Sequence, residues 1–201
     1  MTHSQTLLPM IDEIFSMVQL KPDDVDVIAV SKGPGSFTGL RIGAATGKGI
    51  ALALDKKMVA VPTLAAMAYN LYGDSRYICP VMDARRKHLY SGIYTFDGDR
   101  LITVRDVNLE SYDELAEELA GLDGQVVLVG DGVDVAGDVL KEQLGDKCVL
   151  APAHIKTQRA GSVALLAKQM ADNGEYTDAD ELKPDYCLLY TSDAADEARS
   201  V

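Results

Sequence analysis

The first periodic pattern in the chain is helical. Between residues 4 and 18, apolar side chains recur three and four positions apart, which places them on one face of a helix. Pro9 is expected near the first turn, where a helix tolerates proline, and the run Lys21–Asp24 should end the helix. The apolar positions are Leu7, Leu8, Ile11, Ile14, Phe15 and Val18.

Strands and helices then alternate. Continuous apolar runs of four residues, at 27–30 and 58–61, indicate buried strands, and glycine and proline mark the loop that follows the first of them. This order predicts an α/β protein with a parallel sheet. The predicted elements are a strand at 25–30, a loop at 33–39, a helix at 40–54, a strand at 58–61 and a helix capped by Thr63 that runs through Leu71.

The pattern changes after Gly73-Asp74-Ser75, which we take as the boundary between a first lobe at 1–73 and a second at 74–186. Residues 77–83 and 88–107 alternate in polarity around a turn at 97–99, as antiparallel strands do. Ser111 and Glu114 form a capping box for a helix. The remaining predicted elements are helices at 111–121, 133–144 and 160–173 and strands at 126–129 and 147–150.

The net charge and the cysteine content argue against several classes of function. The formal net charge is −12, whereas proteins that grip nucleic acid directly carry a basic surface. The three cysteines form no CxxC pair and keep no metal spacing with the histidines, which predicts no metal site and fits a reducing cytoplasm. The apolar runs are too short to span a bilayer, so we expect no membrane association.

The glycine-rich loop fits none of the usual chemical motifs. A dinucleotide fingerprint would need glycine at Thr38, and a Walker loop would need glycine at Ile42. A nucleophile elbow around Ser36 would need glycine at Pro34 and Thr38. We therefore predict no catalytic residue here. The loop is either a tight strand-to-helix turn, which we favour, or an anion cradle at a helix N-terminus.

Gly39, Gly43 and Gly47 lie four residues apart along the second predicted helix. Each glycine costs helix stability, about 1 kcal/mol relative to alanine, so close approach of another backbone is the expected reason. That backbone belongs either to the chain's own sheet, which we favour, or to a helix of another subunit.

Two polar clusters are open to two interpretations each. Asp83 with Arg85 and Arg86 either forms a local ion pair at a strand end, which we favour, or orients an anion. Asp131 between two glycines is either turn chemistry or part of the lining of a site.

The two ends of the chain are unusual. The stretch Cys187–Glu197 resembles a translated sequencing adapter, and we expect residues 187–201 to be disordered read-through; the alternative is a natural acidic tail. The helical pattern begins at Thr2 without a preceding strand, so we expect an N-terminal piece to be missing.

Four motifs resemble the TsaB (YeaZ) family. The run Gly33-Pro34-Gly35-Ser36-Phe37-Thr38-Gly39-Leu40-Arg41-Ile42-Gly43 matches that family's signature loop and helix start. Supporting matches are the first-helix motif at 2–10, the strand motif Asp83–Arg86 with Leu89-Tyr90, and the C-terminal motif Lys183-Pro184-Asp185-Tyr186. The resemblance spans residues 2–186.

The resemblance implies a two-lobed, actin-like ATPase (ASKHA) fold, here without the N-terminal strands of the first lobe. It also implies a non-catalytic scaffold without a cofactor. Its partner would be a TsaD-like subunit that transfers threonylcarbamoyl to adenosine 37 of tRNAs that read ANN codons. A TsaE-like ATPase would be a further component. The chain would contact tRNA only through these partners. The first two helices would pair with TsaD, or with a second copy in a homodimer. The implied partner-binding residues are His3, Leu7, Met10, Ile14, Gly39, Arg41, Gly43 and Gly47.

The family opens with a strand, a phosphate loop and a hairpin, which this sequence lacks. The strand at 25–30 would then have an unpaired edge, so we expect the chain to be unstable or to aggregate. A peptidase and a small-molecule kinase of the same superfold are the competing functions. The first would need metal ligands or a nucleophile, and the second would need phosphate loops.

Overall fold

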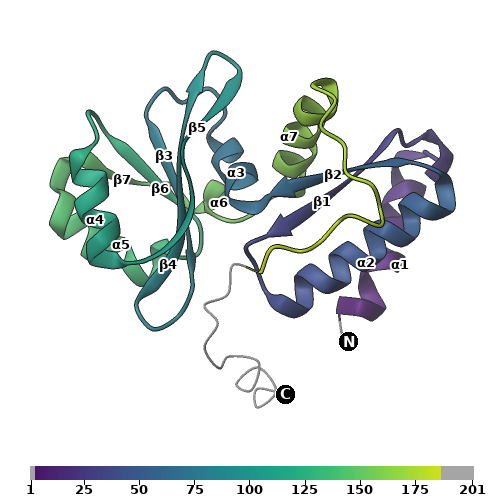
Figure 1. Ribbon diagram of the computed structural model, residues 1–201, viewed down its shortest axis with the longest axis horizontal. Helices are drawn as coiled ribbons and strands as arrows, with labels where there is room; N and C mark the ends of the chain where they lie inside the picture. Colours follow the sequence, from purple (N-terminus) through teal and green to yellow (C-terminus); the bar gives the residue numbers. More distant parts are fainter. Residues whose placement is uncertain (1–2, 187–201) are drawn as a thin grey trace.

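A computed structural model describes the backbone of residues 3–186 and the side chains of residues 5–186 (Figure 1). The expectations for Thr2, for the His3 side chain and for residues 187–201 lie outside the described residues.

The first part of the chain forms a two-stranded parallel sheet covered by helices. Strands β1 (Val27–Gly33) and β2 (Lys57–Pro62) pair from Val27–Lys57 to Ser31–Val61, with a bulge before Gly33. Helix α2 (Phe37–Leu54) connects them. This parallel pair confirms the predicted α/β pattern. Within residues 3–186, no strand pairs with β1 on its other edge.

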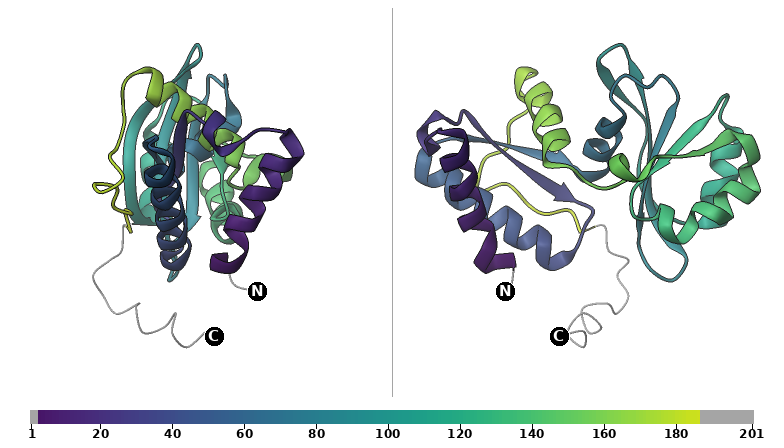
Figure 2. Two further views of the ribbon diagram at one scale, coloured as in Figure 1. Left: turned by 90° about the vertical axis from the view of Figure 1, so that its right-hand side faces the viewer. Right: turned by 180° about the vertical axis from the view of Figure 1, so that it is seen from behind.

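Helix α1 (His3–Val18) confirms the first predicted helix and packs against α2. Figure 2 shows the two helices side by side on the outer side of the small sheet. Pro9 lies beyond the first turn, inside the helix, so the expected position was wrong. Since proline has no backbone N–H, the helix lacks one of its hydrogen bonds there. A short 3-10 turn, η1 (Pro22–Asp24), follows.

The second sheet has five strands in the order β5-β4-β3-β6-β7. The neighbours β3–β4 and β4–β5 are antiparallel, as the alternating pattern predicts, and β3–β6 and β6–β7 are parallel. The strands are β3 (Tyr77–Asp83), β4 (His88–Asp97), β5 (Arg100–Ser111), β6 (Val126–Val129) and β7 (Cys148–Leu150).

The other helices lie close to their predicted positions. Ser111 and Glu114 form the predicted capping box. Thr63, however, is the first helical residue, after the N-cap Pro62, so its predicted capping role was wrong. The elements are α3 (Thr63–Ala68), η2 (Tyr69–Leu71), α4 (Tyr112–Gly121), α5 (Val133–Leu144), η3 (Gly145–Lys147), the unpredicted α6 (Ala153–Lys156) and α7 (Ala160–Asp172).

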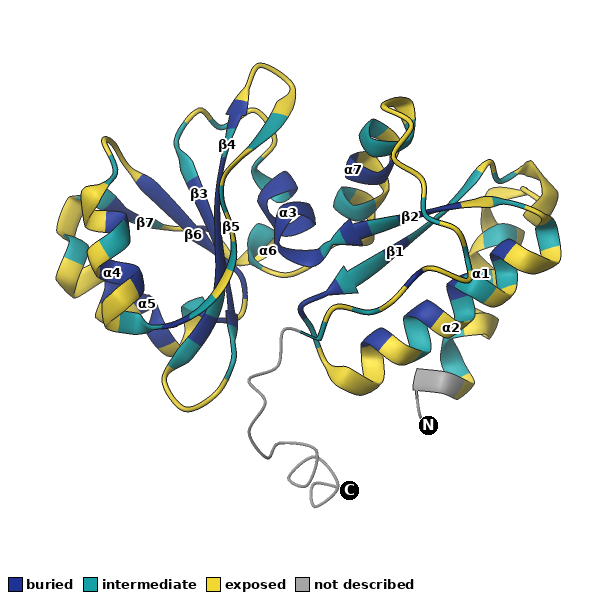
Figure 3. Cartoon of the chain, in the orientation of Figure 1, coloured by how far each residue is buried: buried dark blue, intermediate teal, exposed yellow. Residues whose placement is uncertain are grey.

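Among the described residues, three apolar cores lie between these layers, and Figure 3 shows the buried residues along the strands and on the inner sides of the helices. One lies between α2 and the small sheet, and another between the five-stranded sheet and helices α4 and α5. The third joins the two sheets through α3 and α7, because it contains Val61 of β2, Ile78 of β3 and Leu166 of α7. The lobe boundary near Gly73 stays a prediction.

Candidate partner-binding surface

The signature loop turns the chain tightly from β1 into α2. Ser36 is the N-cap of α2, and its Oγ accepts a hydrogen bond of 3.3 Å from the backbone N–H of Gly39. This geometry confirms the predicted strand-to-helix turn. Because Ser36 caps the helix, α2 begins at Phe37. Since β1 ends at Gly33, the predicted loop at 33–39 was one residue too long at its start and three too long at its end.

Gly33 takes a backbone conformation that glycine favours, with φ of 127°. A Cβ atom at this position would lie 1.9 Å from the carbonyl oxygen of Asp185. No side chain fits in that space, so the close approach of the C-terminal segment requires glycine here.

The C-terminal arm, which we define as Lys183–Tyr186, lies against the signature loop. The backbone N–H of Asp185 donates a hydrogen bond of 2.6 Å to the carbonyl of Lys32. The Tyr186 ring packs on Phe37 with 4.8 Å between ring centroids, and the Arg41 guanidinium carbon lies 5.0 Å from the Phe37 centroid. Two of the sequence motifs, about 150 residues apart, therefore meet in the fold.

The three glycines of α2 have different surroundings. Gly47 is buried, and a Cβ there would lie 2.4 Å from the Val30 side chain. Gly43 is half-buried, with nothing within 4 Å of an added Cβ, and Gly39 is exposed. A four-residue step overshoots a helical turn by about 40°, so the row rotates from solvent toward the sheet. The expected packing on the chain's own sheet therefore holds for Gly47 alone.

Helix α1 carries apolar side chains on its outer side. Met10, Ile14 and Met17 have 56%, 57% and 72% of their surface exposed. Residues at these spacings lie on one side of a helix, and large apolar side chains are usually buried. Leu7 is half-buried and Arg41 is exposed. This face, together with the open surface at Gly43 of α2, is the candidate partner surface.

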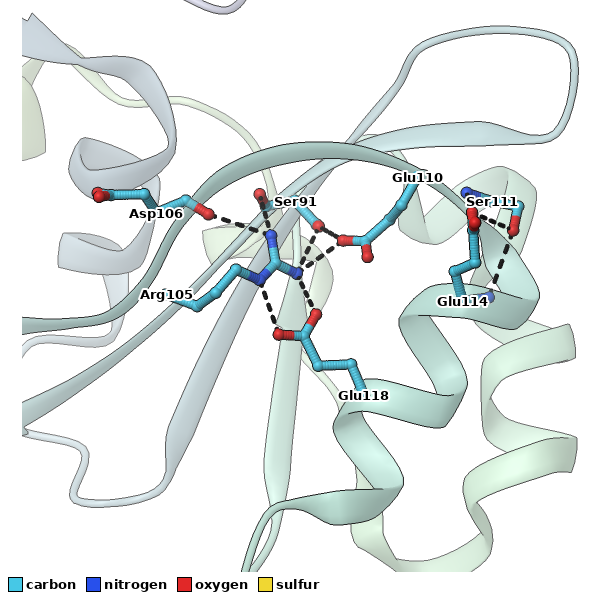
Figure 4. Close-up of polar contacts among 7 residues, drawn as sticks. All are labelled: Ser91, Arg105, Asp106, Glu110, Ser111, Glu114 and Glu118. Atoms are coloured by element: carbon cyan, nitrogen blue, oxygen red, sulfur yellow. Dashed lines mark hydrogen bonds and ion pairs between the residues drawn. The ribbon is translucent and has the colours of Figure 1, made fainter.

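Sequence reasoning missed a buried ionic cluster (Figure 4). Arg105 of β5 reaches Glu110 at 2.6 Å and Glu118 of α4 at 2.8 Å, and Glu110 is 5% exposed. Arg105 also donates to the carbonyl and the Oγ of the buried Ser91, at 3.0 Å each. The Ser91 hydroxyl in turn donates to Glu110.

This cluster fastens the edge strand β5 to β4 and α4. Burial disfavours the charged guanidinium, but Glu118 and Glu110 outweigh that effect and raise the pKa of Arg105. One signal in the sequence could have located this ionic cluster. Ser91 lies between Leu89 and Ile93 in a period-two pattern, which places its hydroxyl on the buried face of the strand.

The two polar clusters, around Asp83 and at Asp131, can be compared with the interpretations offered for each from the sequence. Asp83 pairs with Arg85 at 3.1 Å and accepts the Arg85 backbone N–H at 2.8 Å, which confirms the local ion pair. Asp131 lies in the turn between β6 and α5, where its backbone carbonyl accepts a hydrogen bond of 3.0 Å from the Asp134 N–H. The predicted turn position is confirmed, and a role of its side chain in lining a site stays a prediction.

Residues 3–186 contain no group of three or more His, Cys, Asp or Glu side chains placed to hold a metal ion. None of the described helices is long and apolar enough to cross a membrane.

Comparisons with known proteins identify the family. The family model for TsaD, tRNA N6-adenosine threonylcarbamoyltransferase, matches residues 1–196. The tRNA threonylcarbamoyladenosine biosynthesis protein TsaB of Bacillus subtilis is 30% identical over 195 residues, which cover 96% of this chain and 82% of that protein. The Escherichia coli TsaB is 31% identical over 191 residues, with 92% and 80% covered.

Solved structures agree. YeaZ from Pseudomonas aeruginosa superposes with a TM-score of 0.74 at 25% identity, covering 92% of this chain and 85% of that one. A structure described as an uncharacterized protein with similarity to peptidase YEAZ, also from Pseudomonas aeruginosa, gives a TM-score of 0.78 at 25% identity, with 93% and 85% covered. The chain has the actin-like fold that the sequence resemblance implies, and it belongs to the TsaB (YeaZ) family.

Proposed function

We propose that this protein is the accessory, non-catalytic partner of a TsaD-type transferase that forms threonylcarbamoyladenosine at position 37 of tRNA. A TsaE-like ATPase would be the third component, and the complex would work in the cytoplasm. The net charge of −12 disfavours direct binding to phosphates. The transferase would therefore supply the contact with tRNA.

The exposed apolar face of α1 is the observation that carries this proposal. Met10, Ile14 and Met17 each expose more than half of their surface, and exposed apolar patches of this kind mark interaction sites. At Gly43 the neighbouring α2 leaves open space above its backbone, where a partner helix can approach closely. Gly47 is buried against Val30 and is left out of the proposed surface.

A homodimer is the alternative use of the same surface. Two copies related by a twofold axis would bury Ile14 of each chain in one self-complementary contact. Self-association would then compete with the transferase for the same residues.

Light scattering coupled to size exclusion tests the pairing. The chain is mixed with the TsaD-type transferase of Bacillus subtilis, with the Bacillus subtilis TsaB as the positive control. We expect a 1:1 complex that is lost in Ile14→Asp and in Gly43→Trp. Nothing lies within 4 Å of a Cβ at Gly43, so that variant should still fold.

Leu165→Asp is the matched control, because Leu165 is an apolar residue of α7 that is 58% exposed. It should bind like the unaltered chain. If the Bacillus subtilis TsaB binds the transferase and this chain does not, the proposed role is wrong. If the chain forms a stable homodimer that Ile14→Asp disrupts, the surface is right and the partner is a second copy.

A peptidase or small-molecule kinase activity is the competing proposal. The described residues bring no metal-binding group together, and the signature loop serves as a turn into α2. Hydrolysis of a protein substrate or of ATP by the purified chain, lost in a single-residue variant, would favour this alternative.

A further inference from the structure

The C-terminal arm packs against Phe37, whose ring also lies beside Arg41, one of the predicted partner-binding residues. Figure 1 shows the C-terminal segment, in yellow, running between β1 and α2, and the arm is its last part, near the end of β1. Phe37 is the first residue of α2 and is 36% exposed. Tyr186 of the arm packs on its ring, and Arg41, a candidate partner-binding residue, lies 5.0 Å from the ring centroid.

The arm begins at a firm anchor and becomes more exposed beyond it. Leu182 is 2% exposed and belongs to the core between α2 and the small sheet. Beyond it, Lys183 and Asp185 are exposed, and Pro184 and Tyr186 are half-buried. Ordering these exposed residues costs conformational entropy, which the contacts of the arm with Lys32, Gly33 and Phe37 must offset. The arm is therefore the part of the C-terminal segment where detachment is expected, while the buried Leu182 stays in place.

We propose that the arm is a detachable strap whose docking on Phe37 and Gly33 is coupled to binding at the α1–α2 surface. Docked, Tyr186 holds Phe37 and so fixes the ring on which Arg41 lies. Undocked, Phe37 and Arg41 gain rotamer freedom that a partner would have to remove on binding. The docked state therefore binds the partner more tightly, and by reciprocity the partner favours docking. The coupling rests on the proposed function, whereas the docking of the arm does not.

The first experiment tests docking in the full chain alone. The sequence contains no tryptophan, so Tyr186→Trp places one fluorescent reporter on the arm. Acrylamide quenching measures its exposure. We expect quenching to increase when Phe37→Ala or Gly33→Ala is added, because the first removes the ring contact and the second puts a Cβ against the Asp185 carbonyl. Leu165→Ala, far from the arm, should change nothing. Equal quenching in all of these variants would overturn the strap.

The second experiment tests coupling by titrating the chain with the transferase of Bacillus subtilis. Tyr186→Ala should weaken binding by about 5- to 10-fold, within the usual range of coupling between two sites. The partner should also reduce the quenching of Trp at position 186. Tyr176→Ala is the control, because Tyr176 lies earlier on the same C-terminal segment and packs over Lys57 at 4.2 Å.

The outcomes distinguish failure of the proposed coupling from failure of the proposed partner function. If the unaltered chain binds and Tyr186→Ala binds equally well, the coupling is refuted and the partner role stands. If the unaltered chain fails to bind, the function and the coupling fall together, and the quenching result still decides whether the arm docks.

Discussion

The two sheets of this protein differ in how completely their strands are buried and paired. In the five-stranded sheet, every residue of β6 is buried, and β6 has a strand on each side. In the small sheet, most residues of β1 are half-buried and Val30 is 9% exposed. The helices differ in the same way, because α4 buries Leu115 and Leu119 while α1 exposes Met10, Ile14 and Met17.

This contrast separates apolar residues that are buried within the chain, and so stabilise it, from apolar residues on α1 that would be buried only by a binding partner. Apolar surface contributes to stability only when it leaves water. Substitutions in the second sheet should therefore change the free energy of unfolding, and substitutions on α1 should change binding instead.

The largest expected effect is at the ionic cluster of the second sheet. Arg105→Met leaves the buried Glu110 without its guanidinium partner, and removing one member of a buried pair costs about 3–5 kcal/mol. Urea denaturation measures the loss. Arg85→Met is the control: its pair with Asp83 is at the surface, with 83% of the Arg85 side chain exposed, so we expect less than about 1 kcal/mol. Similar losses for both would contradict the structural role of the cluster.

Leu128→Ala should cost about 2–5 kcal/mol, because Leu128 of β6 is fully buried and its truncation leaves a cavity. Met17→Ala on α1 should change the free energy of unfolding by no more than about 0.5 kcal/mol. The same denaturation experiment compares the two. A large loss at Met17 would mean that α1 covers the chain's own core, and the comparison of the two regions would fail.

Hydrogen exchange compares the sheets without any substitution. The backbone amides of β1 should be at least about tenfold less protected than those of β6, because regions with few buried contacts open locally at lower free energy. Equal protection, or a cooperative melting transition of residues 1–186 at high temperature, would instead show that the small sheet is as stable as the large one.

Apart from the Met17 and Arg85 controls, the smallest expected effect concerns the junction between the two regions. The side-chain hydrogen bond from Arg76 lowers the pKa of Asp74 below its ordinary value of 3.8. A lowered pKa in the folded state adds stability above pH 3.8, and that stability is lost as the pH falls through the folded value. Asp74→Asn should therefore cost about 1 kcal/mol at pH 7, and the difference from the unaltered chain should shrink in denaturation curves below pH 4. A constant difference down to pH 2 would exclude the ionised pair.

Local chemistry accounts for what could be predicted from the sequence. Helix α5 occupies its predicted residues, Val133–Leu144, because helical period and glycine punctuation act over a few residues. The capping box of α4 was predicted for the same reason. Thr63 shows the limit: it has cap chemistry, but Pro62 fixes the helix start one residue earlier.

Contacts between distant parts of the chain could not be predicted. Nothing in the residues around Phe37 indicates that Tyr186 packs on it, and the Arg105 cluster depends on how β4, β5 and α4 meet. The glycine row of α2 was recognised, but only the fold decides that Gly47 faces Val30 while Gly43 stays open. The candidate surface therefore combines a predicted helix pair with exposure that only the structure supplies.

The position of α7 has a consequence for synthesis on the ribosome. This helix covers the small sheet, and its Leu166 shares a core with Val61 of β2, yet it follows β2 by about a hundred residues. At translation rates of about 5–20 residues per second, β2 waits roughly 5–20 s for that cover. During this interval the nascent chain presents an apolar sheet face to water, so chaperones that hold such faces would have their main opportunity to act before α7 emerges.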